Sequence, residues 1–224
     1  MIVATRNSER YLEEALASLR ALSYRPAEIV LVDGASTDGT LAVAARFREV
    51  RIVPQSDEGV ADAYNLGIAS TSSPLVAFLS ADDRRRPSSL GEQVARLAAD
   101  PDLAYVTGRA AFFLETGFEP PVGFRRELLG TERPATIMET LLVRRAALAL
   151  VGPFDPKLRS AEDVDWFARA RALGLRSESL ETTIVDKRIH DSNTSLDAAA
   201  NTARLLKVLR DAAARHAAAR EGTR

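Results

Sequence analysis

Two adjacent carboxylates, Asp82 and Asp83, come directly after an apolar run at residues 75–79, and the hydroxyl of Ser80 precedes them. Oxygen ligands in a loop after a buried strand suit a hard divalent cation such as Mg²⁺ or Mn²⁺, which keeps several waters and bridges substrate phosphates. The structural alternative is an acid pair that balances the dipole of the helix predicted after Pro87. Both interpretations are open on these residues alone.

Three further acids, Glu162, Asp163 and Asp165, open a predicted helix. Acids in a first helical turn normally balance the helix dipole, but one of them could instead act as a general base that takes a proton from a hydroxyl. Asp33 follows another apolar run and could either accept a hydrogen bond from a nucleotide base or ribose, or cap the turn before Ser36. For each of these acids the structural role is the more common one.

His190, one of only two histidines, follows a predicted strand and could bind a metal or a phosphate; the alternative is a histidine in a surface loop. Arg84, Arg85 and Arg86 follow the acid pair directly. Guanidinium groups match phosphate geometry, so these arginines could hold a diphosphate or an anionic acceptor. Three consecutive side chains cannot share one face, however, and we favour a solvated loop.

The composition narrows the class of partner. Lys and Arg number 30 against 31 Asp and Glu, and the resulting net charge of −1 disfavours nucleic acid. The chain has no cysteine, so any metal site depends on carboxylates, histidine and water. No apolar run approaches the roughly 18 residues of a membrane-spanning helix, and the N-terminus lacks the pattern of a signal peptide. We expect a cytoplasmic protein.

Short apolar runs alternate with helix-period segments through the first half of the chain. The predicted strands are 2–5, 28–32, 51–53 and 75–79, and the predicted helices are 8–19, 40–47, 60–69 and 88–99. Continuous Val, Ile and Leu runs are typical of strands buried on both faces of a parallel sheet. Ligands then gather at the carboxyl ends of the strands, where Asp33 and the segment 80–83 lie. The length of 224 residues suits a single domain.

The second half is less regular. Strands are predicted at 104–108, 110–114, 137–143 and 184–189, and helices end at 151 and span 162–173 and 196–220. Residues 115–134 are rich in Gly and Pro and indicate a surface excursion. We find no internal repeat and no linker that would divide the chain.

Five segments stand in an order and at spacings that make a specific signal. They are ATRN at 4–7, VDGASTDGT at 32–40, DEGVADAYNLG at 57–67, FLSADD at 78–83, and GPFD at 152–155 followed by Glu162-Asp163. Together they resemble the family 2 glycosyltransferases of GT-A fold, over about residues 2–195. The resemblance implies a Rossmann-like, three-layer α/β/α single domain with a mostly parallel central sheet.

The resemblance also implies a set of donor-binding residues. Asp33 matches the acid that contacts the nucleotide base, and Asp62 with Asn65 matches the segment that lines the nucleotide-sugar pocket. Ser80 stands where the fuller metal motif has its first Asp, and Arg6 replaces a frequent aromatic. The implied set is completed by Thr5, Arg6, Ser80 and Ala81.

The implied catalytic residues lie on both halves of the chain. Asp82 matches the last Asp of the metal-binding Asp-X-Asp element, and His190 resembles a histidine that many members place near the metal and diphosphate. Asp163 matches the general base of a Glu-Asp pair with Glu162. The family is inverting. The implied reaction transfers a sugar from a nucleotide sugar to an acceptor hydroxyl, and a UDP-sugar is the expected donor. The implied cation is Mn²⁺ or Mg²⁺, and the implied process is polysaccharide, glycolipid or glycoconjugate biosynthesis.

We therefore expect two functional halves of one domain, 1–100 for donor binding and 101–195 for the acceptor and the catalytic base, followed by a C-terminal helix at 196–224. Basic residues beside the apolar stripe of this helix could make a peripheral membrane contact, but we favour a packed helix or a homodimer contact.

Two other functions remain as alternatives. A sugar-1-phosphate nucleotidyltransferase usually carries a Gly-rich basic loop after the first strand, and residues 4–8 contain no glycine. A catalytically degenerate domain that binds a nucleotide sugar is suggested by Ser80, because that position lacks the first acid of the metal motif.

Overall fold

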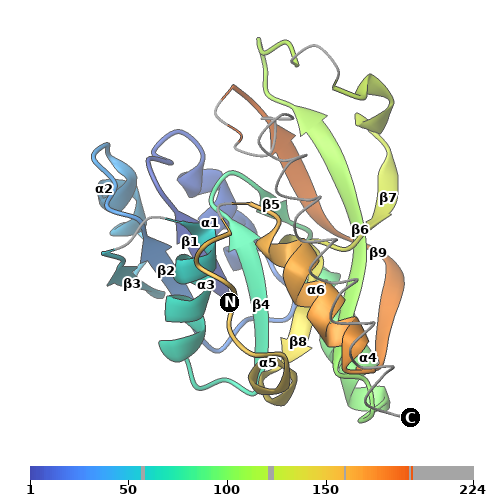
Figure 1. Cartoon of the computed structure of the whole chain (residues 1–224). Helices are drawn as coiled ribbons and strands as arrows, with labels where there is room; N and C mark the ends of the chain where they lie inside the picture. The colour runs from blue at the N-terminus through green and yellow to red at the C-terminus, as the bar shows by residue number, and fades with distance from the viewer. Residues whose placement is uncertain (57–58, 121–123, 159, 192, 194–224) are drawn as a thin grey trace.

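Four parallel strands form one half of the central sheet in the computed structural model, which describes residues 1–56, 59–120, 124–158, 160–191 and 193 (Figure 1). They are β1 (Ile2–Thr5), β2 (Ile29–Asp33), β3 (Val50–Pro54) and β4 (Leu75–Ser80), in the order β3-β2-β1-β4. The helices between them are α1 (Leu12–Arg20), α2 (Thr40–Ala44) and α3 (Val60–Ala69). β2 is buried along its whole length, as expected of an apolar strand covered on both faces.

The second half of the sheet mixes both strand directions. β8 (Leu142–Arg144) runs antiparallel to β4, β6 (Tyr105–Leu114) antiparallel to β8, and β9 (Ser177–Ile189) parallel to β6. Two short antiparallel strands complete the sheet, β5 (Arg84–Arg85) on β9 and β7 (Glu132–Ala135) on β6. The remaining helices are α4 (Ser89–Ala99), α5 (Arg145–Val151) and α6 (Glu162–Ala172). Among the described residues the sheet has nine strands.

Helices cover both faces of this sheet. Side chains of α1, α2 and α4 share one buried apolar cluster with Val3 and Leu31, whereas those of α3, α5 and α6 share another with Ile2 and Val30. Successive residues of a strand point to opposite faces, so the central strands supply both clusters. The result is the three-layer arrangement that the sequence predicts. The strand pairs within the first half are all parallel, whereas the second half contains both parallel and antiparallel pairs.

Some predicted elements differ from those observed. The two strands predicted at 104–108 and 110–114 form one strand, β6, whose register with β9 shifts beside Gly108. A Cβ at Gly108 would lie 2.6 Å from Ile184 Cγ1 and 2.8 Å from the Thr182 carbonyl oxygen, so this close approach requires glycine. β9 begins well before the predicted start at 184. The 3₁₀ turns η1 (Arg126–Leu128) and η2 (Met138–Thr140) occupy parts of the predicted excursion and of the predicted strand at 137–143.

The solvated loop that we favoured for the three consecutive arginines is wrong. Arg84 and Arg85 form β5, and Arg85 is buried, with its guanidinium donating to Gln93 Oε1 and to two backbone carbonyls. Arg86 pairs with Asp186 of β9 at 2.8 Å. Because a buried guanidinium must be hydrogen-bonded, Arg85 serves the scaffold and is not available to grip a phosphate.

The C-terminal helix predicted at 196–224 lies outside the described residues. The homodimer and the peripheral membrane contact therefore stay predictions. None of the helices in the described part of the chain combines the length and the apolar character that a membrane crossing requires.

Candidate active site

The loops after β1 and β2 hold each other through hydrogen bonds. Asn7 Oδ1 accepts from the Thr37 amide at 2.8 Å, and Ser36 Oγ accepts from the Asn7 amide at 2.9 Å. Asn7 has a φ of 49°, a left-handed conformation that asparagine tolerates better than most residues. These bonds fix the carboxyl ends of two parallel strands, the edge at which such sheets bind ligands.

Asp33 lies at this edge and is buried. Its carboxylate accepts twice from Ser36, from the hydroxyl at 2.5 Å and from the amide at 3.1 Å. The turn-capping role is therefore present, and contact with a nucleotide base stays a prediction. Thr5 pairs with Asp33 in register and is buried, whereas the neighbouring Arg6 is exposed.

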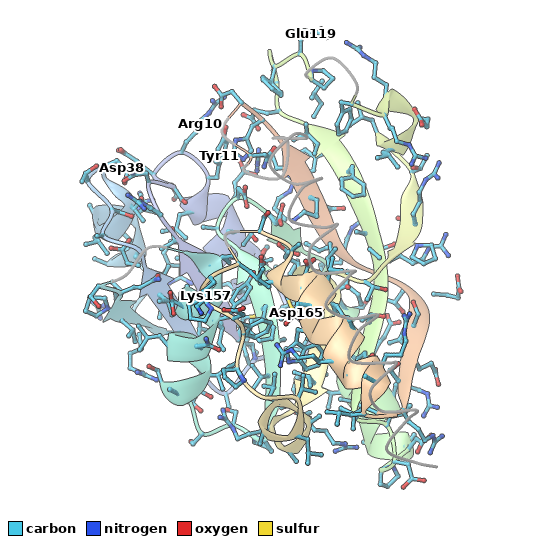
Figure 2. All side chains as sticks on the ribbon, viewed as in Figure 1. Arg10, Tyr11, Asp38, Glu119, Lys157 and Asp165 are labelled. Carbon is cyan, nitrogen blue, oxygen red and sulfur yellow. The ribbon has the colours of Figure 1, made fainter. Side chains whose placement is uncertain are left out.

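The fold brings Asp82 and His190 together across 108 positions of sequence. His190 Nε2 lies 3.0 Å from Asp82 Oδ2, and Asn193 Nδ2 donates to the same oxygen at 3.2 Å. His190 is buried, with its ring centroid 4.5 Å from that of Tyr11, which lies at the start of α1 (Figure 2). The alternative of a surface-loop histidine is therefore wrong. Ala81, beside Asp82, is also buried.

Asp82 is the candidate metal ligand of this site. Burial alone would raise its pKa, but the hydrogen bond with His190 and the charge of Lys187 outweigh burial and lower it. Its side chain is 25% exposed. Within the described residues no three His, Asp or Glu side chains cluster into a complete metal site. The pair fits a cation that, like Mg²⁺, takes one or two protein ligands and completes its shell with substrate phosphates and water.

Asp83 serves the scaffold instead. Its carboxylate is 1% exposed and accepts from Lys187 Nζ at 2.7 Å and from the Arg188 amide at 3.0 Å. Burial raises its pKa to about 7, against the opposing charge of Lys187. Asp83 thus ties the loop after β4 to β9, and it is not the helix-dipole partner considered from the sequence.

Glu139 and Lys187 complete this cluster, and our reading of the sequence missed both. Lys187 Nζ lies 3.0 Å from Glu139 Oε1, and Ser80 Oγ donates to the same oxygen at 2.6 Å. Burial would lower the pKa of Lys187, but the charges of Asp83 and Glu139 outweigh burial and raise it. The sequence does contain a sign of Glu139, because it is a single acid inside the apolar segment 137–143. A buried acid requires a partner, so this position indicates a buried ion pair.

The predicted base opens α6. Burial raises the pKa of Glu162 to about 8, with the charge of Asp163 as the next cause. Burial also raises the pKa of Asp163 to about 6, although its Oδ1 accepts from the Val164 amide at 2.7 Å. A base whose pKa lies near neutrality suits proton transfer from a hydroxyl. Asp165, labelled on the same helix in Figure 2, is instead paired with Arg169 at 2.8 Å.

Glu139 connects the two groups of acids. It accepts from Ser80, which ends the strand before Asp82, and its charge is among the causes that raise the pKa of Glu162 and of Asp163. Glu139 is thus bonded to the end of β4, and its charge acts on the acids at the start of α6.

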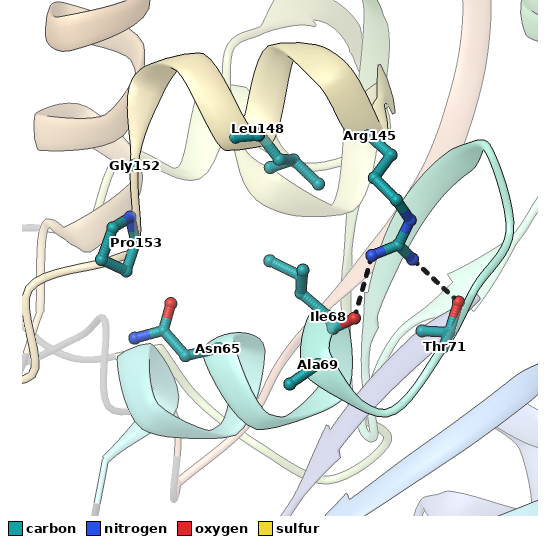
Figure 3. Close-up of a pocket in the computed structure, with 9 residues that line it drawn as sticks. Asn65, Ile68, Ala69, Thr71, Arg145, Leu148, Gly152 and Pro153 are labelled. Carbon is teal, nitrogen blue, oxygen red and sulfur yellow. Dashed lines mark hydrogen bonds between the residues drawn. The ribbon is translucent and has the colours of Figure 1, made fainter.

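Asn65 and Asp62 lie on α3. Asn65 pairs with both backbone groups of Phe154, donating at 2.8 Å and accepting at 2.9 Å, and so fixes the segment after α5. Asn65 also lines a mostly apolar hollow of 360 Å³ with Pro153 and Arg145 (Figure 3), and none of the catalytic candidates lines it. Asp62 is half-buried in the first turn of the helix. Contact of Asp62 and Asn65 with a nucleotide sugar stays a prediction.

Residues 1–151 match the family model described as glycosyl transferase family 2, which is more than half of the chain. The chain belongs to this family. The matched part of the family 2 chain runs from β1 to the end of α5 and holds Asp33 and Asp82. Glu162, Asp163 and His190 lie beyond it, so their roles depend on the geometry above.

Named relatives agree with this membership. The family 2 chain is 27% identical over 226 residues to an uncharacterized glycosyltransferase of Nostoc sp., covering 90% of this chain and 68% of the relative. It is 32% identical over 206 residues to the succinoglycan biosynthesis protein ExoU of Rhizobium meliloti, covering 79% of this chain and 57% of that protein.

Among solved structures the family 2 chain is similar to residues 1–349 of S. aureus TarS in complex with UDP, with a TM-score of 0.72 at 20% identity, over 96% of this chain and 64% of that one. The complex of TarS with UDP-GlcNAc gives 0.69 at 22% identity, over 88% and 60%. The chain thus spans between 57% and 68% of these proteins. The likeness confirms the predicted GT-A type fold, and the family match confirms the predicted glycosyltransferase family.

Proposed function

We propose that this family 2 chain transfers a sugar from a nucleoside-diphosphate sugar to an acceptor hydroxyl, with inversion at the anomeric carbon. The observation that carries the proposal is the contact of Asp82 with His190, with Nε2 3.0 Å from Oδ2, and the raised pKa values of Glu162 and Asp163 at the start of α6 support it. The first pair suits a diphosphate and its cation, and the second supplies a base for a hydroxyl.

Asp163 is the proposed general base. It takes the proton of the acceptor hydroxyl while that oxygen forms a bond to the anomeric carbon. The bond from the anomeric carbon to the diphosphate oxygen breaks, and its electron pair leaves with the diphosphate. Attack and departure occur on opposite faces, so the configuration inverts. Glu162, whose pKa is raised to about 8 by burial and then by Asp163, is mostly protonated at neutral pH and does not compete as the base.

Asp82 and His190 would hold the divalent cation, Mn²⁺ or Mg²⁺. A bound cation supplies charge that stabilises the leaving diphosphate. The proposed donor side lies in residues 1–100, and the base lies in residues 101–195 together with His190. The residues proposed to contact the donor are Thr5, Arg6, Asp33, Asp62, Asn65, Ser80 and Ala81.

UDP is the proposed nucleotide, because TarS structures of the same fold are complexes with UDP and UDP-GlcNAc. Polysaccharide biosynthesis is the proposed process, because ExoU is a succinoglycan biosynthesis protein. Both assignments are carried from relatives, and a donor screen tests the first directly.

The decisive experiment measures nucleotide release from a panel of UDP-, GDP- and dTDP-sugars with Mn²⁺, for wild type and Asp163→Asn. We expect release of UDP from at least one donor by the wild type, and a loss of 10² to 10⁴ in the variant, the usual contribution of a positioned base. The affinity for free UDP is expected to be unchanged, because Asp163 acts on the acceptor.

Two results would contradict the proposal. Donor affinity without nucleotide release by the wild type would favour a domain that only binds nucleotide sugars. Undiminished turnover in Asp163→Asn would remove this residue from the base role.

A further inference from the structure

The aromatic ring of Tyr11 lies against the imidazole of His190. The two ring centroids are 4.5 Å apart and the ring planes are tilted by 44°, a separation at which aromatic rings attract each other. Both residues are buried, with 6% of Tyr11 and 4% of His190 exposed. Tyr11 directly precedes α1, whereas His190 directly follows β9, so the contact joins two elements that are far apart in the sequence.

Arg188, on β9, holds the same ring. Its guanidinium carbon lies 4.9 Å from the centroid of the Tyr11 ring, which is a cation–π contact. Arg188 is itself fixed, because it pairs with Glu14 of α1 at 2.7 Å and donates to the Asp82 carbonyl at 3.0 Å. Glu14 and Tyr11 are three positions apart, the spacing at which side chains lie on one face of a helix. The start of α1 is thus anchored to the end of β9 through both of these side chains.

This anchor lies where His190 meets Asp82. Asn193 holds the main chain of the histidine, because its Oδ1 accepts from the His190 amide at 2.7 Å. Asp82 Oδ2 holds the edge of the imidazole, 3.0 Å from Nε2, and Tyr11 packs against the ring. A cation bound by both Asp82 and His190 would take the place of the contact between Nε2 and Oδ2. The packing against Tyr11 would then remain to keep the imidazole in its orientation.

We propose that Tyr11 is a positioning residue of the cation site, whose ring holds the imidazole of His190 in the orientation that binds the cation of the donor diphosphate. The inference rests on the proposed function and adds to its cation site a residue that none of the sequence motifs includes. The ring carries this role rather than the hydroxyl, because within the described part of the chain the Tyr11 hydroxyl is buried without a hydrogen-bond partner. Residues that orient a metal ligand typically contribute about 10- to 100-fold to metal affinity.

The test measures the dissociation constant of Mn²⁺ by electron paramagnetic resonance, in the presence of saturating UDP, GDP or dTDP. Tyr11→Leu keeps an apolar side chain but removes the ring, and we expect it to weaken Mn²⁺ binding on the order of 10-fold. Tyr11→Phe keeps the ring and removes only the hydroxyl, so its constant should lie within about 2-fold of wild type. The affinity for the nucleotide without metal should be unchanged in both variants.

A double-variant cycle shows whether Tyr11 acts through His190. In the His190→Ala background, Tyr11→Leu should weaken Mn²⁺ binding by less than about 2-fold further, because the residue that it positions is already gone. A loss of affinity that came from general destabilisation would instead be added to the loss caused by His190→Ala.

Phe47→Leu is the matched control. Phe47 lies between α2 and β3 and is 5% exposed, and the Arg20 guanidinium carbon lies 4.3 Å from its ring centroid. The variant therefore removes an equally buried ring with the same kind of cation–π contact. It should lower the free energy of unfolding in urea as Tyr11→Leu does, yet leave the dissociation constant of Mn²⁺ unchanged.

The outcomes separate the inference from the function on which it rests. The inference is overturned if Tyr11→Leu leaves the Mn²⁺ constant unchanged, if its effect persists in full in the His190→Ala background, or if the wild type binds no Mn²⁺. In each of these cases nucleotide release from a donor sugar would leave the proposed transfer standing. Conversely, Mn²⁺ binding that depends on the ring of Tyr11, in a wild type that binds donors without releasing nucleotide, overturns the proposed function and supports the inference.

Discussion

Loss of the Glu162 proton lowers the stability of the folded protein. Burial, followed by the charge of Asp163, raises its pKa from 4.5 to about 8. A raised carboxyl pKa contributes stability that is complete below the unfolded pKa and is lost as the pH rises through the folded one. Glu162 is only part-buried, and solvent therefore reduces the cost of its negative charge. We expect ionisation of Glu162 to destabilise the folded protein by about 2 kcal/mol.

Glu162→Gln is therefore predicted to stabilise the fold only at higher pH. The difference in free energy of unfolding between variant and wild type should be near zero at about pH 4 and reach about 2 kcal/mol in favour of the variant at about pH 9, measured by urea unfolding. Glu49→Gln is the opposite control, because its hydrogen bond with Arg20 lowers the Glu49 pKa to about 2. If the difference in free energy of unfolding between Glu162→Gln and wild type did not change with pH, the raised pKa of Glu162 would be contradicted.

Asp163 gives a prediction for activity. Its pKa is raised to about 6 by burial, and the base must be ionised to accept a proton. We expect kcat/KM to be level above about pH 7 and to fall tenfold per unit below about pH 6, and Asp165→Asn should keep this profile. The measurement is kcat/KM for the best donor from pH 5 to 8. A level profile over that whole range would argue against Asp163.

At the scale of elements, β9 assembles the site. Lys187 bonds to Asp83 and Glu139, and Arg188 pairs with Glu14 at 2.7 Å and donates to the Asp82 carbonyl at 3.0 Å. His190, which meets Asp82, directly follows the last residue of the strand. One strand thus joins the loop after β4, the turn η2 and the first helix, which are far apart in sequence.

Lys187→Met is predicted to destabilise the protein by about 3 to 5 kcal/mol, because two buried carboxylates lose their counter-ion. Urea unfolding at about pH 7.5 measures it. Lys157→Met is the matched control, since Lys157 is exposed, and should change stability by less than about 0.5 kcal/mol. A loss below about 1 kcal/mol for Lys187→Met would show that the buried cluster contributes little.

The sequence predicts those elements that are formed by local pattern. The strands of the first half read as continuous apolar runs because both of their faces are covered. The first part of β9 escapes notice because residues 177–183 are largely polar and part-exposed. β5 is a two-residue strand that exists only through its pairing with β9. Glu139 and Lys187 could not be predicted either, because their partners are far away in the sequence and are brought to them only by the fold.

At the scale of the whole molecule, the two functional halves share their cores. Trp166, in the second half, lies in the same buried cluster as Ile2 and Val30 of the first, and the opposite cluster joins Val3 to Val185. Both buried clusters thus contain side chains from both halves. The division at about residue 100 is therefore one of proposed function, and we expect residues 1–191 to unfold as one cooperative unit.

Trp166 is the only tryptophan of the chain, so its fluorescence reports the second half while far-ultraviolet circular dichroism reports the whole. We predict coincident urea transitions by the two probes. Ile2→Ala, which opens a cavity under β1 in the first half, should lower stability by about 2 to 5 kcal/mol and shift both transitions equally, because the cavity opens in the cluster that holds Trp166. A fluorescence midpoint that stays in place while the dichroism midpoint falls would mean that the halves fold independently. The sheet would then join two domains rather than form the core of one.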